Sequence, residues 1–445
     1  MISVLLVEDD PDVLELTRLF LERDLGLNID ACLSVKEALR KLNHKIYNVV
    51  VSDYVMPEIN GIQLLKTLKF QGIDTPFIIF TGKGGEEIAI EALNSGATFY
   101  LQKSENPRFQ FAKLRKMIYQ AALKQQTEET FRENNICVVI PAYNEEKLIG
   151  TTLASVPDYI FRIYVVDDAS TDRTPEIIHE SAERDTRLMH IRHEINQGVG
   201  ASIASGYREA LKESMDIAVV MAGDNQMDPS YLPDFLDPII KRQADYAVGN
   251  CLQGPEYRKG MKKRRFFGNA LLTLLTKIAS GYWQLMDPQN GYTAISRRAL
   301  ERIDLNKIYP RYGYCNDILV KLNAYGFKAK NINHKPRYNI GEISERKNRT
   351  FTFRLSWLLF RDFFWRLKEK YVILNFHPLV FFYFFGVVII LISIIFGFYS
   401  LYLKLVWDQD LLVRGALSLL LFFMGSMFLL FAMLFDMEQE RNVGW

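Results

Sequence analysis

The sequence predicts two doubly wound α/β domains in series, followed by a hairpin of two membrane-spanning helices. Short apolar runs alternate with helix-like stretches over residues 1–122 and again over residues 136–345, a pattern typical of parallel sheets covered by helices. Near the C-terminus, the segments Leu379–Tyr399 and Gly415–Phe435 contain no charged residue over 21 positions each. The length of 445 residues is compatible with about three domains.

The composition excludes several functional classes. The 54 Lys and Arg residues against 52 Asp and Glu residues leave a net charge of +2, whereas a nucleic-acid-binding protein needs a clearly basic domain. The four cysteines lie far apart without a CxxC pair, so we expect reduced thiols and no structural zinc site. The six histidines form no HxxxH pattern. The opening segment MISVLLVEDDPD lacks the basic region of a signal peptide.

In the N-terminal segment, five predicted strands alternate with five predicted helices. The strands are Ser3–Val7, Asn28–Cys32, Val49–Ser52, Phe77–Thr81 and Thr98–Leu101. The helices are Pro11–Arg23, Val35–Leu42, Ile62–Lys69, Glu86–Ser95 and Phe109–Lys124. Ligands of such sheets sit at the carboxyl ends of the strands. Polar residues stand at these ends: Glu8, Asp9 and Asp10 after the first strand, Asp53 after the third, Thr81 at the end of the fourth and Lys103 after the fifth.

The carboxylates at these strand ends point to a divalent cation, because like charges a few ångströms apart do not all stay ionised without one. Ligand sets made only of oxygen atoms suit Mg²⁺. The Thr81 hydroxyl and the Lys103 ammonium would then hold the oxygens of a phosphoryl group on Asp53.

Residues 1–122 resemble the receiver domain of two-component response regulators, because VLLVEDD, DYVMPEING, FTG and FYLQK match its motifs in order. The resemblance implies Mg²⁺ at Glu8, Asp9 and Asp53, with Asp53 as phosphoacceptor, Thr81 and Tyr100 as the switch pair, and Lys103 as a phosphate contact. It also implies a histidine kinase as partner. The chain departs from the family at Ser104, where a proline is usual. The alternative is a receiver-like fold that no longer takes phosphate.

Residues 123–135 are polar and contain neither Gly nor Pro, so we expect a helical linker that extends the last receiver helix. Strand signals then return at Cys137–Ile140, Ile163–Val166, Leu188–Arg192, Ile217–Met221 and Tyr246–Asn250. Helices are expected between them, at Glu146–Val156, Thr174–Asp185, Val199–Lys212 and Tyr231–Arg242. The pattern is again that of a parallel α/β domain, here over residues 136–345.

Acidic residues follow two strands of this second domain. Asp167 and Asp168 follow its second strand, and Asp224, Gln226 and Asp228 follow its fourth. Two such clusters at one edge of a sheet suggest a metal-bound diphosphate, with one carboxylate left to hold a base or ribose.

Four segments, VVIPAYNEE, VVDDASTD, NQGVGASIASGYREAL and VVMAGDNQMDP, resemble the family-2 glycosyltransferases of the Rossmann-like GT-A fold. Within that family, the chain is most similar to the polyprenyl-phosphate glycosyltransferases typified by dolichyl-phosphate mannose and glucose synthases. The resemblance extends to RRFFGNALLT and DPQNGYTAISRRAL. It implies a nucleotide-sugar site formed by Pro141, Tyr143, Glu145, Asp167, Asp168 and Asp224, with Asp224 and Gln226 holding Mg²⁺ or Mn²⁺. The family usually has a further Asp where this chain has Ala222.

The chemistry that the resemblance implies is an in-line displacement with inversion at the anomeric carbon. A lipid phosphate arrives already anionic, so a strong general base is unnecessary. The candidate catalytic residues are Asp224, Asp287 and Asp317. The expected lipid-phosphate contacts are Arg264 and Arg265, in the basic run Arg258–Arg265, together with Arg311 and Arg337. The basic run is equally compatible with a solvated loop held against anionic lipid.

Residues 350–371 mix Phe, Trp and Leu with Arg and Lys, which favours an amphipathic helix in the headgroup plane. The alternative is a coat helix packed on the catalytic domain. Transmembrane helices are expected at 377–405 and 411–436, because each apolar core can cross a hydrocarbon layer of about 30 Å. Many cations precede the first span, so the positive-inside rule places both ends of the chain, and both domains, in the cytoplasm.

The sequence therefore predicts a membrane-bound inverting glycosyltransferase that moves a hexose from a nucleotide sugar, of the GDP-mannose or UDP-glucose type, to polyprenyl (dolichyl) phosphate. Phosphorylation of Asp53 would regulate it. One alternative is a membrane-tethered signalling protein that binds a nucleotide sugar without turnover. Another is a polysaccharide-type glycosyltransferase, which would need more spans and a QxxRW-like motif. Paired hairpins and receiver faces also make a homo-oligomer an open possibility.

Overall fold

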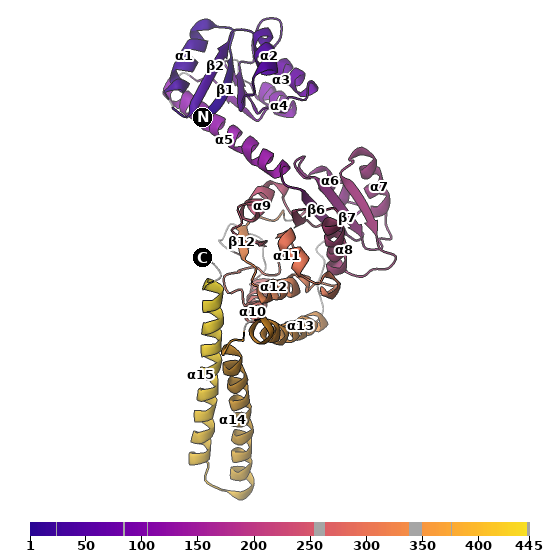
Figure 1. The fold of residues 1–445 in the computed structure, drawn as a ribbon, viewed down its shortest axis with the longest axis vertical. Coiled ribbons are helices and arrows are strands. Elements are labelled where there is room, and N and C mark those ends of the chain that lie inside the picture. Colours follow the sequence, from indigo (N-terminus) through magenta and orange to yellow (C-terminus); the bar gives the residue numbers. More distant parts are fainter. Residues whose placement is uncertain are drawn as a thin grey trace. The chain divides into compact units, whose positions relative to one another are not determined.

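A computed structural model describes residues 1–23, 25–82, 85–104, 106–252, 263–337, 349–374 and 376–442; at 107–108, 263–271, 349–353 and 440–442 only the backbone is described. The chain divides into two compact units, Met1–Glu133 and Asn134–Trp445. Figure 1 shows a sheet with surrounding helices in each unit and a pair of long helices at the C-terminal end. The predicted fold class, two α/β units and a C-terminal helical pair, is confirmed.

The first unit is a parallel five-stranded sheet in the order β2-β1-β3-β4-β5, which is the doubly wound order expected for a receiver fold. Its strands are β1 (Ile2–Val7), β2 (Leu27–Cys32), β3 (Val49–Ser52), β4 (Phe77–Thr81) and β5 (Phe99–Gln102). Its helices are α1 (Pro11–Glu22), α2 (Val35–His44), α3 (Gly61–Phe70), α4 (Glu86–Asn94) and α5 (Pro107–Arg132).

Both faces of this sheet are covered by helices. On one face, Leu14 of α1 and Leu114 of α5 belong to one buried cluster. On the other face, Ala38 of α2, Leu65 of α3 and Ala92 of α4 belong to a second cluster. The strands between them are apolar along their whole length because they are buried on both sides.

Local sequence signals fix where the helices of this unit begin. Asp10 caps α1 by accepting hydrogen bonds from the backbone N–H groups of Asp12 and Val13, and Pro11 stands at the first helical position. Asp10 is therefore committed to the helix start rather than to the neighbouring carboxylates. Helix α5 continues without interruption to Arg132, through most of the segment expected to be a helical linker.

The second unit contains a seven-stranded sheet in the order β12-β10-β11-β9-β6-β7-β8. Its strands are β6 (Ile136–Ala142), β7 (Arg162–Asp167), β8 (Leu188–Arg192), β9 (Ile217–Val220), β10 (Tyr246–Asn250), β11 (Thr293–Ser296) and β12 (Ala329–Asn333). Its helices up to β12 are α6 (Ile149–Ala154), α7 (Thr174–Arg184), α8 (Val199–Lys212), α9 (Leu232–Ile240), α10 (Lys263–Ser280), α11 (Arg297–Arg302) and α12 (Tyr314–Ala324).

The expectation of a wholly parallel second sheet is wrong at one strand. Strand β11 lies between β9 and β10 and runs antiparallel to both. Neither β11 nor β12 was predicted, because β11 has only four residues and the polar and apolar positions of β12 alternate weakly. All other neighbouring pairs of this sheet are parallel: β6 with β7 and β9, β7 with β8, and β10 with β12.

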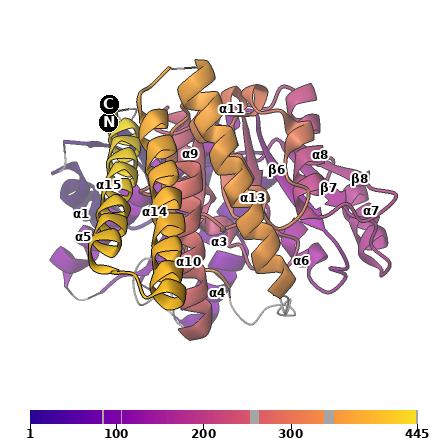
Figure 2. The same cartoon turned by 90° about the horizontal axis from the view of Figure 1, so that it is seen from below.

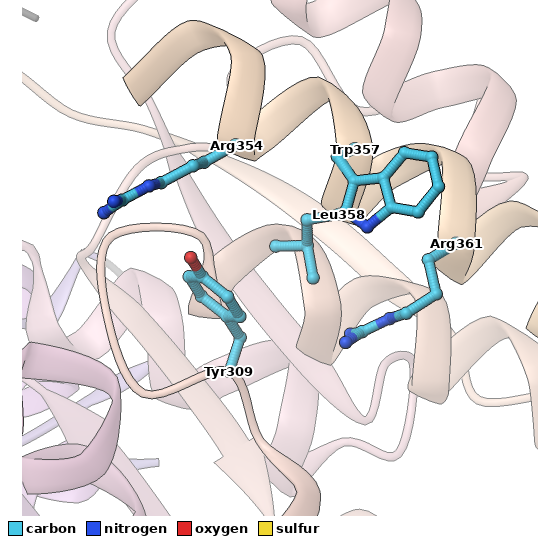
Figure 3. Close-up of a pocket in the computed structure, with 5 residues that line it drawn as sticks. All are labelled: Tyr309, Arg354, Trp357, Leu358 and Arg361. Carbon is cyan, nitrogen blue, oxygen red and sulfur yellow. The ribbon is translucent and has the colours of Figure 1, made fainter. Parts of the chain in front are cut away.

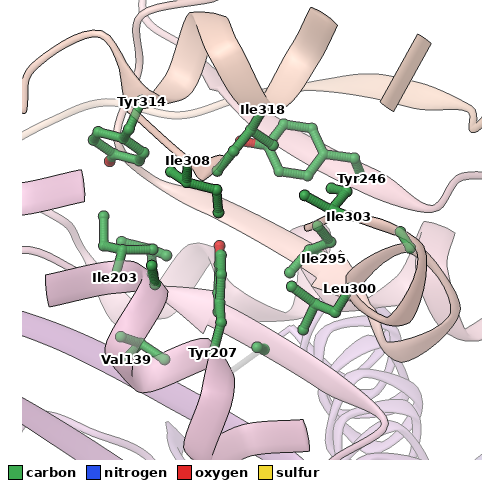
Figure 4. Close-up of a cluster of buried hydrophobic side chains, with 14 of the residues drawn as sticks. Val139, Ile203, Tyr207, Tyr246, Ile295, Leu300, Ile303, Ile308, Tyr314 and Ile318 are labelled. Atoms are coloured by element: carbon green, nitrogen blue, oxygen red, sulfur yellow. The ribbon is translucent and has the colours of Figure 1, made fainter. Parts of the chain in front are cut away.

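A single large core joins helices α8, α11 and α12 to the second sheet. Figure 4 shows Tyr207 of α8 pointing into this cluster, among Ile203, Ile308 and Leu300. Helix α8 lies directly on β6, because a Cβ at Gly206 would stand 2.3 Å from Val139. The close packing holds the start of α8 at the edge where β6 and β7 end.

Helix α13 (Arg349–Lys368) packs on α10 and α12 and is followed by a π-helical turn, Glu369–Leu374. One side of α13 buries Leu355, Leu358 and Leu359, as the coat-helix alternative predicted. The opposite side exposes an aromatic stripe, Trp357, Phe360 and Phe364. One side of α13 therefore covers α10 and α12, and its opposite, apolar side is exposed.

Helices α14 (Leu379–Trp407) and α15 (Leu412–Asn442) form an antiparallel hairpin, and Figure 2 shows them side by side. Both are long and apolar enough to cross a membrane, with mean hydropathies of 3.0 and 2.4. Their contact includes two reciprocal hydrogen bonds: the Ser393 hydroxyl donates to the Ser418 carbonyl at 2.8 Å, and the Ser418 hydroxyl donates to the Ser393 carbonyl at 2.9 Å. Gly386 and Gly425 allow the closest approach of the two backbones.

A buried ion pair connects this hairpin to helices α10 and α13. The Arg366 guanidinium of α13 donates to both carboxylate oxygens of Asp436 in α15, at 2.9 and 2.8 Å, and also to the Ile278 carbonyl of α10 at 3.1 Å. The Tyr371 hydroxyl donates to the same carboxylate. Gly281 leaves room for the guanidinium, since a Cβ there would lie 2.3 Å from Arg366 Nη1. The pair ties α10, α13 and α15 together.

We expect the variant Arg366→Met to lose about 3–5 kcal/mol of folding free energy, because Asp436 would be left buried and uncompensated. The double variant Arg366→Met/Asp436→Leu should recover most of this loss, because it removes both charges. Thermal unfolding of the full chain in detergent measures the two effects. Equal losses in the single and double variants would contradict this account.

Asp362 of α13 is almost fully buried, and its Oδ1 accepts hydrogen bonds from the adjacent Arg361 at 2.8 and 3.0 Å. Burial, with a smaller contribution from the nearby Asp317 carboxylate, raises the pKa of Asp362 to about 6. Because this folded-state pKa lies above the ordinary value of 3.8, the stability that the protonated form provides is lost as the pH rises through about 6.

The isosteric variant Asp362→Asn should therefore gain stability relative to the natural chain at pH 8, show a smaller gain at pH 5, and show little or no gain at pH 3, below the ordinary pKa of 3.8. The measurement is the difference in Tm between the two proteins at each pH. A difference that does not change with pH would show that the Asp362 carboxyl does not titrate in this range.

Candidate functional site

The first candidate site lies at the carboxyl edge of the receiver sheet. Glu8 and Asp9 follow β1 and Asp53 follows β3, and one ligand atom from each lies within 4.8 Å of the others. Because β1 and β3 are adjacent parallel strands, their ends bring these carboxylates together. The cluster consists of oxygen ligands only and fits a Mg²⁺ ion.

Lys103 lies against the same carboxylates. Its Nζ is 2.6 Å from Glu8 Oε2 and 3.3 Å from Asp53 Oδ1. Burial raises the pKa of Glu8, while the Lys103 ammonium acts in the opposite direction. The Oδ2 atom of Asp53 accepts a hydrogen bond from the Val55 N–H at 3.0 Å. The lysine therefore stands where it can contact a phosphoryl group carried by Asp53.

The predicted switch pair lies on neighbouring strands of the same sheet. Thr81 ends β4 and is fully buried. Tyr100 lies on β5, paired in register with Ile79, and its buried hydroxyl finds no hydrogen-bond partner within the described part of the chain. Gly61 lies directly against the backbone of Asp53, the predicted phosphoacceptor, because a Cβ there would lie 2.2 Å from the Asp53 carbonyl oxygen.

The second candidate site lies at the carboxyl edge of the sheet in the second unit. Strand β6 is flanked by β7 and β9, so the loops that follow these three strands meet. The Asp168 N–H donates to the Ala142 carbonyl at 2.9 Å, and the Thr152 hydroxyl donates to the Gly223 carbonyl at 3.0 Å. Segments that are up to 80 residues apart in sequence are thereby brought to one edge.

Asp168 is occupied by bonds within the protein. Its carboxylate accepts from the N–H groups of Gln197 and Gly198, at 2.9 and 2.7 Å, and lies 2.7 Å from His193 Nδ1. It therefore fixes the loop that starts α8. The adjacent Asp167 is fully buried, and its Oδ1 accepts from the Ser170 N–H at 2.9 Å.

The loop after β6 carries the other predicted nucleotide-sugar residues. Pro141 is half-buried within β6, Tyr143 is 47% exposed, and Glu145 is half-buried. The Glu145 N–H donates to the Thr174 hydroxyl at 2.8 Å, and this bond joins the loop to the start of α7. Tyr143 is thus the most accessible side chain of the three.

Asp224 and Gln226 lie in the loop after β9. Asp224 Oδ1 accepts from the Gln226 N–H at 3.1 Å, and burial raises the pKa of Asp224. Oxygen atoms of a carboxylate and an amide are suitable ligands for Mg²⁺ or Mn²⁺. A carboxyl group held in a buried position would also gain from the charge of a bound cation.

Arg337 braces this loop, a role that sequence reasoning missed. Its guanidinium donates to Asn225 Oδ1 at 3.0 Å and to Asp228 Oδ1 at 2.9 Å, and its N–H donates to the Gln226 carbonyl at 2.9 Å. Asn225 has a φ of 55°, a left-handed conformation that asparagine tolerates. Direct contact between Arg337 and a lipid phosphate stays a prediction.

The two other candidate catalytic acids differ in their surroundings. Asp317 of α12 is buried and accepts from the Tyr309 N–H at 2.7 Å and from the Lys321 ammonium, an arrangement that favours a structural role. Asp287 Oδ2 lies 3.2 Å from Asn290 Nδ2 and 3.4 Å from the Cys251 N–H. Asp287 therefore lies beside the end of β10.

The structure describes only some of the arginines that were predicted to contact the lipid phosphate. Residues 258–262 of the basic run lie outside the described part of the chain, as do the side chains of Arg264 and Arg265 at the start of α10. Arg311 is exposed in a loop that packs over the start of α8. The loop needs glycines below it, because a Cβ at Gly198 would lie 2.6 Å from the Pro310 carbonyl and one at Gly200 would lie 2.1 Å from the Tyr309 carbonyl.

Comparison with known proteins identifies a family for each of the two α/β domains. Residues 137–304 match the model of glycosyl transferase family 2, and residues 4–118 match the response regulator receiver domain. A UDP-N-acetylglucosamine–dolichyl-phosphate N-acetylglucosaminyltransferase of Methanococcus voltae is 31% identical over 221 residues, which cover 47% of this chain and 83% of that protein. The chain belongs to glycosyltransferase family 2.

This family-2 glycosyltransferase also carries a response regulator receiver domain. Response regulator SaeR of Staphylococcus aureus is 36% identical over 108 residues, which cover 24% of this chain and under half (46%) of that protein. The solved receiver domain of a Francisella response regulator is 32% identical, with a TM-score of 0.26, and covers 28% of this chain and 99% of that one. Both families predicted from the sequence motifs are confirmed.

We expect the full chain to incorporate an alkali-labile phosphoryl group when it is incubated with acetyl phosphate and Mg²⁺, and the variant Asp53→Asn to incorporate none. The reason is that the Asp53 carboxylate stands between the other acids and the Lys103 ammonium. The measurement is phosphate bound per chain. Asp74→Asn, an exposed acid of the same unit, is the matched control and should label normally; equal labelling of Asp53→Asn would disprove the assignment.

Proposed function

We propose that this glycosyltransferase transfers a sugar from a nucleotide sugar to polyprenyl phosphate at a membrane surface. The observation that carries the proposal is the combination of a strand-end acid site with two long apolar helices in one compact unit. The relative from Methanococcus voltae, whose name specifies a dolichyl-phosphate acceptor, supports the same acceptor class. Its donor, UDP-N-acetylglucosamine, joins GDP-mannose and UDP-glucose as a candidate donor.

The proposed reaction is a single displacement at the anomeric carbon. A phosphate oxygen of the lipid forms the new bond, the bond to the nucleotide diphosphate breaks, and the configuration inverts. Because the acceptor oxygen is already anionic, the chain's own residues need only to bind and orient the two reactants. Tyr143 and Glu145 line the proposed nucleotide pocket, and Asp168 holds the loop that starts α8.

Asp224 and Gln226 would hold Mg²⁺ or Mn²⁺, which when bound stabilises charge on a leaving diphosphate. Arg337 keeps these two residues in place through Asn225 and the Gln226 carbonyl. Asp287, at the neighbouring loop, is the second candidate to orient the acceptor. Asp317 would have a positioning role, because its carboxylate accepts a hydrogen bond from the Tyr309 N–H.

We further propose that residues 377–405 and 411–436 span the membrane and that residues 350–371 lie at its surface, with both domains on the cytoplasmic side. The proposed receiver domain spans residues 1–122, the linker residues 123–135 and the transferase domain residues 136–345. A histidine kinase would phosphorylate Asp53, and the signal would pass along α5. That helix ends at Arg132, only four residues before β6 begins at Ile136.

One feature of the sequence supports a competing function. Ala222 stands where the family usually has an acid, so the metal site has one oxygen ligand fewer available. A protein that binds nucleotide sugar without turnover would follow from such a loss. A polysaccharide-type reaction is less well supported, because two spanning helices are found in the described part of the chain.

The test is an assay of membranes that contain the full chain, with Mn²⁺ or Mg²⁺, polyprenyl phosphate and a panel of labelled nucleotide sugars. Label that enters organic solvent and is released by mild acid establishes transfer to the lipid. Binding of a nucleotide sugar without any such label would instead support the binding protein. The variant Asp53→Asn, assayed with and without a phosphodonor, tests the regulatory part, and unchanged rates in both conditions would contradict it.

In this assay we expect Asp224→Asn to lower turnover by about 100-fold or more, because it removes a charge from the site of the leaving diphosphate. Asp237→Asn, an exposed acid on α9 that pairs with Lys241, is the matched control and should retain full activity. Full activity in Asp224→Asn would remove this residue from the catalytic site.

A further inference from the structure

A small pocket opens between α13 and the loop that precedes α12. It is lined by Tyr309, Arg354, Trp357, Leu358 and Arg361 (Figure 3). Four of these residues come from α13 at spacings of three, four and seven, so they share one side of that helix. In Figure 3 the two arginines flank Tyr309 and Leu358. The lining therefore combines two cations, an aromatic hydroxyl and an apolar base.

The two guanidinium groups are available to an anion. Arg361 is 57% exposed, and its Nε and Nη2 donate to Asp362 Oδ1 at 3.0 and 2.8 Å. Its Nη1 has no hydrogen-bond partner among the described residues, and Arg354 is exposed without an ion-pair partner in that same part of the chain. Guanidinium groups that flank a pocket suit the oxygens of a phosphate.

A buried carboxylate, that of Asp362, contacts one of the two arginines. Asp362 is 3% exposed, and its Oδ2 has no hydrogen-bond partner within the described residues. Its other oxygen orients Arg361, which leaves the outer edge of that guanidinium directed away from the buried acid. The arrangement fixes one of the two cations in place before any ligand binds.

The pocket adjoins the aromatic stripe of α13. Trp357 lines the pocket and is 62% exposed, and its ring stacks on Phe360 at a centroid distance of 5.7 Å. Phe360 contacts Phe364 at 4.8 Å. Exposed tryptophan beside arginine is typical of the level of lipid headgroups. Helix α13 is followed after one short turn by the first apolar helix of the hairpin.

We propose that this pocket binds the phosphate group of an anionic phospholipid of the surrounding bilayer, with Arg354 and Arg361 on the phosphate and the aromatic stripe among the upper acyl carbons. The inference rests on the membrane anchoring in the proposed function but not on the transfer reaction. The acceptor lipid fits less well, because its phosphate must reach the sugar at the loops after β6, β7 and β9. None of the lining residues belongs to these loops.

The experiment uses the full chain reconstituted in nanodiscs of mixed phosphatidylglycerol and phosphatidylcholine, then released into mild detergent without nucleotide sugar. Native mass spectrometry counts the phospholipids retained per chain. We expect selective retention of one phosphatidylglycerol, and at least a 10-fold lower retention in the variant Arg354→Gln/Arg361→Gln. The charge-matched control, Arg302→Gln/Lys368→Gln, removes exposed cations from α11 and from α13 outside the pocket and should retain the lipid.

The single variant Arg354→Gln guards against misfolding, because Arg354 is exposed, and it should also lose retention. Equal retention by the pocket variants and the natural chain would overturn the proposal. Displacement of phosphatidylglycerol by one equivalent of polyprenyl phosphate would also overturn it and would make the pocket an acceptor site. Lipid retention by a chain that shows no transfer to any acceptor would support this inference while refuting the proposed function.

Discussion

The buried pair between Arg366 and Asp436 is the interaction on which the architecture of the second unit depends. An arginine with no exposed surface needs an opposite charge close by and acceptors for its N–H groups. Here one carboxylate from the end of α15 matches the charge, and that carboxylate and a carbonyl from α10 accept from the two Nη groups. Helix α13 is thereby fixed to the hairpin and to α10 at the same point, and it cannot shift without exposing or isolating a charge.

The same physical rule organises both candidate sites. Parallel strands end at one edge, and the peptide groups there are not all used by the sheet, so acidic side chains in the following loops can gather. In the receiver, a lysine pairs with two of the three carboxylates, those of Glu8 and Asp53. In the transferase, backbone N–H groups and Arg337 perform that function around Asp168 and Asp228. Charge is thus concentrated at the two edges but neutralised differently at each.

Much of this was predictable from sequence, because the deciding signals are local. Strand and helix alternation, the proline at the start of α1 and the acids after strands all lie within short windows. The bracing contacts were not predictable, since Arg337 reaches Asn225 over 112 residues and Arg366 reaches Asp436 over 70. Strand β11 was missed for a different reason, because four residues carry too little periodicity to show their direction.

The reciprocal serine bonds within the hairpin set how far α15 extends beyond α14. Sliding one helix by a single turn would displace the end of α15 by about 5.4 Å and would break both bonds between Ser393 and Ser418. The same slide would take the Asp436 carboxylate out of reach of Arg366. The contact between Ser393 and Ser418 thus fixes the register of α14 and α15, and only that register places the Asp436 carboxylate beside Arg366.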